Sequence, residues 1–156
     1  MGTGKKDFIV SKGKKVSEER KIMETTDGYF TQNDKITKNR LVVIVKQRKR
    51  DGALAVVKIH TPEGKNPDNF VQGVVLKANE HSSLKQDSVV NKHVVVGTKG
   101  ADKTYKPIYK GDFTDTGDKV TKKDQRKILK GAGGKDKQHQ KTEKKKIKRW
   151  QKGFKK

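Results

Sequence analysis

Two stretches of apolar residues stand close together in the first half of the chain. Residues 41–45 read Leu-Val-Val-Ile-Val, and an uninterrupted run of this kind is typical of a strand buried on both faces. The turn residues Asp51 and Gly52 follow, and Asp-Gly supplies the positive φ values of a tight hairpin turn. The chain then returns through a second apolar run at residues 53–59. The pattern predicts an antiparallel hairpin at the centre of the fold.

Shorter apolar segments follow the hairpin and are separated by polar loops. They predict further strands at residues 71–77, 89–90 and 94–96. A helix is expected over residues 122–130, because Thr121 can cap its first turn, Asp124 stands at the third helical position and Gly131 can end it. Several short strands and one late helix predict a mainly β fold, a small, strongly bent antiparallel sheet or partly open barrel with a C-terminal helix.

The two ends of the chain are basic and poor in large apolar side chains. Residues 131–156 hold 11 basic and 2 acidic residues, a net charge of +9, and residues 1–25 carry +3. We therefore predict a basic, flexible N-terminal arm at residues 1–23, a β-barrel domain at residues 24–130 and a lysine-rich C-terminal tail at residues 131–156.

The C-terminal tail contains one amphipathic stretch. Ile147, Trp150 and Phe154 are spaced so that they share one face of a helix, while lysines cover the rest. One interpretation is a segment that folds into a helix on RNA, with Trp150 stacked on a base. Two other interpretations are that this face docks on the chain's own domain, or that the segment is a floppy basic tail.

The chain is strongly basic as a whole. It has 40 Lys and Arg residues against 18 Asp and Glu, a net charge of +22 over 156 residues. This excess favours a polyanionic partner, because each cation that meets a phosphate releases condensed counterions. We expect a nucleic acid, and RNA before DNA; the alternative is a basic surface that only maintains solubility. No membrane is expected as partner, since no apolar run approaches the ~20 residues of a spanning helix.

The residue types also bear on metals and on the compartment. There are no cysteines, so neither disulfides nor thiolate metal sites can form, and no signal peptide opens the chain. The histidines lack the i, i+4 helical spacing of a zinc pair; they are His60, His81, His93 and His139. We therefore expect a cytoplasmic protein without a metal or another cofactor.

One pair of polar residues stands where phosphate chemistry is possible. Arg40 precedes the first strand of the hairpin and Thr61 follows the second. In an antiparallel hairpin these two ends are neighbours, so both residues should lie at one end of the sheet. An arginine beside a hydroxyl can grip a phosphate and stabilise negative charge that builds on it. The alternative is that these residues are ordinary solvated strand ends.

Several segments resemble the MazF/PemK-like toxins in order and separation. The resemblance is carried by Asn39–Val45, by the strand ending at Thr61 and by Leu84–Val90, which contains Asp-Ser-Val. Asp27–Phe30 is similar to the opening strand of those families, and the expected helix at Thr121–Lys130 falls where they have a late helix. The resemblance covers roughly residues 27–130.

This resemblance implies a fold and an activity. It implies an SH3-like barrel, usually a homodimer, that cleaves single-stranded RNA without a metal by attack of the ribose 2′-hydroxyl on the adjacent phosphate, leaving a cyclic phosphate. Arg40 and Thr61 would be the catalytic residues; Arg40 would stabilise the phosphorane, and Thr61 would orient the phosphate. An acidic antitoxin would be a second partner. Our candidates for RNA binding are Lys38, Lys58, His60, Lys85, Ser88, Arg149 and Trp150.

Two other classes of function remain open from the sequence. Electrostatics alone equally supports a non-catalytic nucleic-acid-binding barrel, such as an accessory protein of a mobile element or a ribosome-associated factor. The third class is an interaction protein whose partner is an acidic polypeptide.

Overall fold

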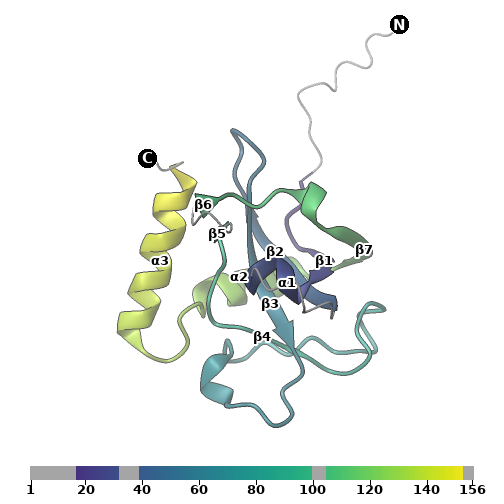
Figure 1. Ribbon diagram of the computed structural model, residues 1–156. Coiled ribbons are helices and arrows are strands. Elements are labelled where there is room, and N and C mark those ends of the chain that lie inside the picture. The colour runs from purple at the N-terminus through teal and green to yellow at the C-terminus, as the bar shows by residue number, and fades with distance from the viewer. Residues whose placement is uncertain (1–16, 32–38, 100–104, 153–156) are drawn as a thin grey trace, which may run out of the picture.

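A five-stranded antiparallel sheet forms the centre of the protein. The computed structural model describes residues 17–31, 39–99 and 105–152, and the strand order in the sheet is β4-β3-β2-β1-β7 (Figure 1). The strands are β1 (Lys21–Thr26), β2 (Asn39–Gln47), β3 (Leu54–His60), β4 (Val89–Val90) and β7 (Thr114–Lys119). A separate pair is formed by β5 (Thr98–Lys99) and β6 (Tyr105–Lys106).

The predicted hairpin is confirmed as β2 and β3. These strands pair antiparallel, with Val43 opposite Val57. The turn is longer than predicted: the Arg48 N–H donates to the Ala53 carbonyl over 2.7 Å, and only Gly52 has a positive φ (+79°). Asp51 instead accepts two hydrogen bonds from the Arg48 guanidinium, at 2.9 and 2.7 Å. The turn is therefore stabilised by a side-chain ion pair as well as by glycine.

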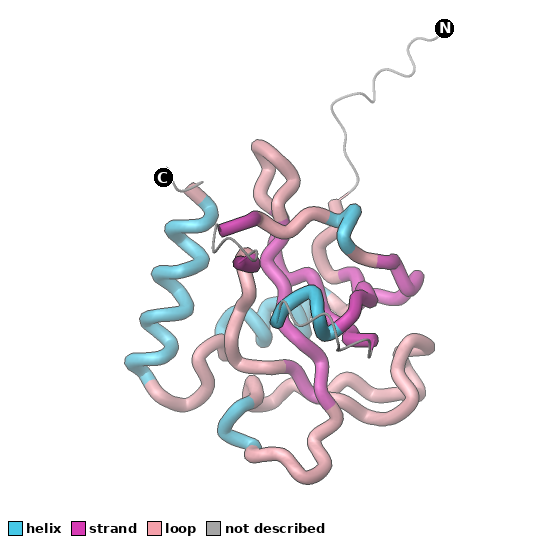
Figure 2. The backbone as a smooth tube through the Cα atoms, viewed as in Figure 1, coloured by secondary structure: helices cyan, strands magenta, loops and turns pink. Residues whose placement is uncertain are grey.

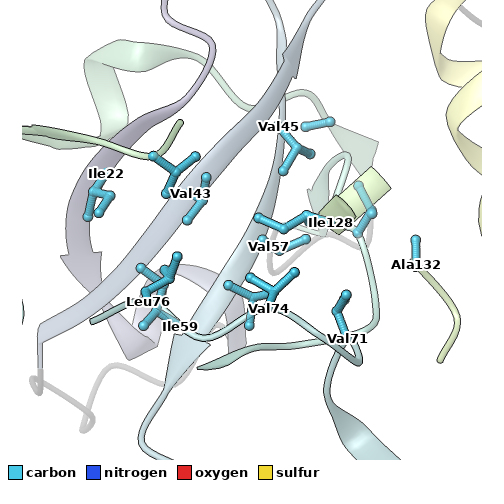
Figure 3. Close-up of a cluster of buried hydrophobic side chains, with 14 of the residues drawn as sticks. Ile22, Val43, Val45, Val57, Ile59, Val71, Val74, Leu76, Ile128 and Ala132 are labelled. Atoms are coloured by element: carbon cyan, nitrogen blue, oxygen red, sulfur yellow. The ribbon is translucent and has the colours of Figure 1, made fainter. Parts of the chain in front are cut away.

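The sheet separates two apolar clusters, because successive residues of β2 point to opposite faces. Val43 and Val45 belong to the larger cluster, which also contains buried side chains from α2 (Lys122–Lys130) and from the 71–76 segment (Figure 3). Val42 and Ile44 belong to the smaller cluster on the other face. The run at residues 41–45 is thus buried on both faces, as its composition predicted.

The N-terminal boundary of the domain lies earlier than predicted. Strand β1 begins at Lys21, inside the expected arm, and pairs with both β2 and β7. Ile22 is fully buried in the larger cluster. Only the short helix α1 (Asp27–Thr31) separates β1 from residues 32–38, which lie outside the described residues. The sequence pattern missed β1, because its alternation is only six residues long and is interrupted by charges.

Residues 71–77 do not form the predicted strand. Gly73 has a φ of +81°, which breaks an extended conformation, and a single bridge joins Leu76 to Ser88. Figure 2 shows that loops make up most of the chain between β3 and β4. Val71, Val74 and Leu76 are nevertheless buried, so the apolar pattern reported burial rather than strand pairing. Residues 94–96 likewise contribute one bridge, from Val95 to Val56, rather than a regular strand.

The predicted late helix is confirmed as α2. Thr121 Oγ1 accepts a hydrogen bond from the Asp124 N–H over 3.0 Å, and the helix ends at Gly131. A bulge in the pairing of β2 with β3 lies next to Val45, and the Val45 carbonyl accepts a hydrogen bond from the Gln125 side chain over 2.9 Å. The bulge therefore provides an anchor for the helix on the sheet.

The structure corrects the prediction of a C-terminal tail. Residues 137–151 form helix α3 (Lys137–Gln151), which lies along one side of the sheet (Figure 1), and Trp150 is fully buried in the larger cluster. Arg48 donates to the Trp150 carbonyl over 2.6 Å and lies over its ring. Glu143 is buried as well, and its carboxylate accepts a hydrogen bond from the Val94 N–H over 2.8 Å. The interpretation in which this face docks on the chain's own domain is the one observed; Phe154 lies outside the described residues.

The fold class is as predicted, a mainly β protein with a small antiparallel sheet and a C-terminal helix. The sheet is open, since the edge strands β4 and β7 are not paired with each other. Within residues 17–31, 39–99 and 105–152, no helix is long and apolar enough to cross a membrane.

Candidate functional site

A large groove lies where β2 begins and β3 ends. Its volume is about 860 Å³, and its lining comes from the strands β1, β2, β3 and β7 and from the loops after β3 and before β4. Five of the residues proposed from the sequence line it; they are Arg40, His60, Thr61, Lys85 and Ser88. The hairpin thus brings Arg40 and Thr61 to one site, as the antiparallel geometry predicted.

Arg40 is fixed at the groove by the neighbouring strand. Its Nη1 donates a hydrogen bond to the Ile59 carbonyl over 3.1 Å and lies 3.1 Å from His60 Nδ1. Since a guanidinium can only donate, Nδ1 of His60 is the acceptor and carries no proton in this arrangement. The side chain of Arg40 is half-buried, so its charge is positioned at the groove.

The His60 ring is oriented by Arg40 and by packing against Phe70, with 5.8 Å between the ring centroids. Its Nε2 lies 3.4 Å from the Asn91 amide nitrogen, but with Nδ1 accepting from Arg40 the ring proton is on Nε2, so this contact is not a hydrogen bond. The amide of Asn91 is itself fixed, because its oxygen accepts a hydrogen bond from the His93 N–H over 2.8 Å. His60 therefore presents a defined orientation at the groove, which suits a role in positioning.

The loop before β4 also lines the groove. Lys85 is exposed there, whereas Ser88 is buried and donates its hydroxyl proton to the Gln86 carbonyl over 2.9 Å. Ser88 also pairs with Leu76 through its backbone. Ser88 thus stabilises the loop that carries Lys85, and only its oxygen lone pairs remain for a ligand.

The carboxylate of Asp118, which is largely buried, attaches this loop to β7. Asp118 lies 3.1 Å from His81 Nδ1, and it accepts a hydrogen bond of 2.6 Å from the Ser83 hydroxyl. Burial raises the pKa of Asp118, but the hydrogen bonds from Ser83 and His81 outweigh it, so its pKa lies below the ordinary value. Ser83 bonds to the aspartate rather than to the histidine, so the trio is a structural tie and not a nucleophile with its base.

Sequence reasoning missed the residues that β1 and β7 add to the groove. Glu24 enters from β1, and Thr114, Asp115 and Thr116 enter from β7. The backbone N–H of Gly117 is the main cause that lowers the pKa of Asp115, whose carboxylate lies 3.4 Å from Lys21. The groove therefore contains carboxylates as well as cations. No local signal could have revealed them, because the pairing of β1 with β7 joins residues about 90 positions apart.

Three of the predicted RNA-binding residues lie elsewhere. Lys58 of β3 does not line the groove, and its Nζ lies 4.8 Å from the centre of the Phe30 ring. Arg149 lines a separate hollow on α3. Trp150 is 0% exposed, so its predicted stacking on a base is wrong for this conformation. Lys38 lies outside the described residues.

The chain was compared with known protein families, with curated proteins and with solved structures, and nothing matches it. Among residues 17–31, 39–99 and 105–152, no three His, Asp or Glu side chains gather as metal ligands. The chemistry of the groove must therefore be argued from its own side chains.

Proposed function

We propose that the chain is an RNA-binding, toxin-like protein that cleaves single-stranded RNA without a metal and leaves a 2′,3′-cyclic phosphate. The observation that carries this proposal is the convergence of Arg40, His60 and Thr61 at one groove, opposite the loop that holds Lys85. The resemblance of these segments to the MazF/PemK-like toxins supports the same activity.

The proposed reaction needs charge stabilisation and two proton transfers. The ribose 2′-oxygen bonds to phosphorus and loses its proton, while the bond to the 5′-oxygen breaks and that oxygen gains a proton. Negative charge builds on the phosphoryl oxygens in between. The positive charge of Arg40, which lines the groove, would stabilise this charge, and the Thr61 hydroxyl would add a donor.

The lining of the groove also contains a carboxylate that can accept a proton. The Nδ1 lone pair of His60 is occupied by Arg40, whereas Glu24 places a carboxylate in the lining of the groove. We assign the removal of the 2′ proton to Glu24, and to His60 the positioning of Arg40. Protonation of the leaving oxygen falls to Arg40 or to water.

Cleavage of a labelled single-stranded RNA in EDTA tests the proposal. The expected products carry a cyclic phosphate and a 5′-hydroxyl, and an RNA with a 2′-deoxyribose at the cleavage site should remain intact. Arg40→Ala should lower the rate by about 10²–10³-fold, the effect of removing one donor to a developing oxyanion. Lys58→Gln is the matched control, since it removes a cation of the same hairpin that does not line the groove.

One outcome would refute catalysis. Tight, salt-sensitive binding to RNA that stays intact would assign the chain to the non-catalytic nucleic-acid-binding class instead. Cleavage that persists in Arg40→Ala at the full rate would refute the site, because a contaminating nuclease would then explain the products.

A further inference from the structure

A second hollow differs from the groove in its residue types and shares no lining residue with it. It has a volume of about 430 Å³ and lies between α2, α3 and the end of β2. We call it the helical cleft; its lining residues that matter here are Leu129, Ile147, Lys46, Lys144, Lys148 and Lys152. Each helix contributes one apolar residue, and the cations come from α3, its C-terminal end and β2.

The floor of the helical cleft is aliphatic. Leu129 of α2 and Ile147 of α3 pack against the larger apolar cluster but are only partly buried. Their remaining surface is open to solvent at the cleft. Covering that surface would stabilise a complex, because apolar area would be removed from water.

The rim of the helical cleft carries one sign of charge. Lys144, Lys148 and Lys152 stand four residues apart along α3, so their ammonium groups are neighbours and repel one another. None of these three, nor Lys46 across the cleft, forms an ion pair with a described residue, and no carboxylate lines the cleft. Carboxylates of a partner would relieve the repulsion between these lysines.

The combination of an aliphatic floor with a rim of lysines distinguishes between a nucleic acid and an acidic polypeptide as partner. A nucleic acid would use the lysines but not the floor, since neither Leu129 nor Ile147 offers a ring on which a base stacks. An acidic amphipathic helix uses both: an apolar side chain enters the cleft and flanking carboxylates meet the lysines. We propose that the helical cleft is a docking site for an acidic amphipathic segment of a partner protein, inserting one leucine-like anchor.

Fluorescence anisotropy of labelled peptides tests this proposal on the full chain. The probe is a peptide of about 15 residues, long enough to form a helix on binding, with leucine at the centre of a glutamate-rich face. Replacing the leucine by serine should weaken binding by at least about tenfold, because the buried anchor is lost. Replacing the glutamates by glutamine should weaken it by a similar factor.

Variants of the protein locate the binding site. The double variant Lys144→Glu/Lys148→Glu should weaken binding of the leucine peptide by at least about tenfold, since the attraction between the lysines at the rim and the glutamates of the peptide becomes repulsion. Lys145→Glu/Arg149→Glu is the matched control: it changes the net charge equally, but these residues line a different hollow. At physiological salt the control should lower affinity by less than about threefold, because screening acts over ~8 Å. All four positions are exposed, and circular dichroism verifies that both variants fold.

Three results would overturn the proposal. The first is equal binding of the leucine and serine peptides, and the second is equal weakening by the two double variants. The third is displacement of the leucine peptide by single-stranded RNA whose own affinity falls in Lys144→Glu/Lys148→Glu. Each would identify the helical surface as a general polyanion surface. None of them bears on RNA cleavage at the groove, which involves other residues.

Discussion

The groove and the helical cleft are both basic, yet they are built for different chemistry. The groove combines cations with the carboxylates of Glu24 and Asp115, a fixed histidine and several hydroxyls. The helical cleft has lysines around an aliphatic floor and no carboxylate. The comparison teaches that a net charge of +22 does not identify a partner. What lies between the cations distinguishes a site for a reacting phosphate from a site for an apolar anchor.

Each region is attached to the body of the protein by a carboxylate, fully buried for Glu143 and largely buried for Asp118. Asp118 holds the loop of the groove to β7, and Glu143 holds α3 to Val94. Burial raises the pKa of Glu143, but the N–H of Val94, His93 and Lys146 lower it below the ordinary value. Trp150 adds a large apolar anchor on the α3 side only. The two regions can therefore be disturbed separately.

The largest expected effect is that of replacing Trp150, which attaches only the α3 region to the core. Trp150→Ala should lower the free energy of unfolding by about 3–5 kcal/mol, the usual cost of removing a buried tryptophan. Guanidinium-induced unfolding measures it. Where the variant remains folded, RNA cleavage should stay at the normal rate while binding of the acidic peptide falls. A loss below about 1 kcal/mol would contradict the packing of α3 on the core.

A smaller effect concerns the loop of the groove and follows from the lowered pKa of Asp118. A lowered pKa contributes stability above about pH 4, the ordinary aspartate value, and this stability is lost as the pH falls through the folded-state value. The Ser83 amide, which donates to Asp118 over 3.3 Å, should therefore lose protection from hydrogen exchange below about pH 4. The protection factor is obtained at each pH by dividing the intrinsic exchange rate of the unprotected amide by the observed rate.

Asp118→Asn provides the control for this acid effect. Its Ser83 amide should show reduced protection already at neutral pH, equivalent to about 1–3 kcal/mol for a lost bond to a buried charge. In this variant the protection of the Ser83 amide should not fall further below about pH 4, because no carboxylate is left to titrate at position 118. Unchanged protection of Ser83 in this variant would mean that Asp118 does not hold the loop.

The smallest effect concerns single lysines and RNA affinity. Lys85→Gln should reduce the slope of log K against log salt by about 0.7, the value for one phosphate contact on a single strand. Lys58→Gln and Lys148→Gln should leave the slope unchanged, because Lys58 does not line the groove and Lys148 lines the helical cleft. Equal changes in all three variants would show that RNA binds the basic surface without a preferred site.

Local patterns in the sequence were reliable where neighbouring residues decide the structure. The hairpin follows from two apolar runs around Gly52, and α2 follows from a threonine cap and a terminal glycine. Because the hairpin fixes which strand ends meet, the sequence also placed Arg40 beside the His60–Thr61 segment. This part of the candidate site needed no tertiary information beyond antiparallel pairing.

Patterns that depend on distant partners were misread. Val71–Lys77 is buried like a strand but finds no continuous partner, and Gly73 turns the chain. The pattern of residues 131–156 predicts a lysine-rich tail and leaves docking on the chain's own domain open; the buried ring of Trp150 and the bond from Arg48 to its carbonyl attach this segment to the core. Strand β1 was overlooked because its pairing with β7 is decided far along the chain.

By itself, the sequence determined the mainly β class, the hairpin with Arg40 and Thr61 at its open end, and the basic character of the surface. These depend on side-chain periodicity, turn residues and charge, which act over a few neighbours. Only the tertiary structure decided that Glu24 and Asp115 share the groove with Arg40, and that Trp150 serves the core. Such placements follow from non-local strand pairing and helix docking, in which buried area gained between distant segments outweighs local preference.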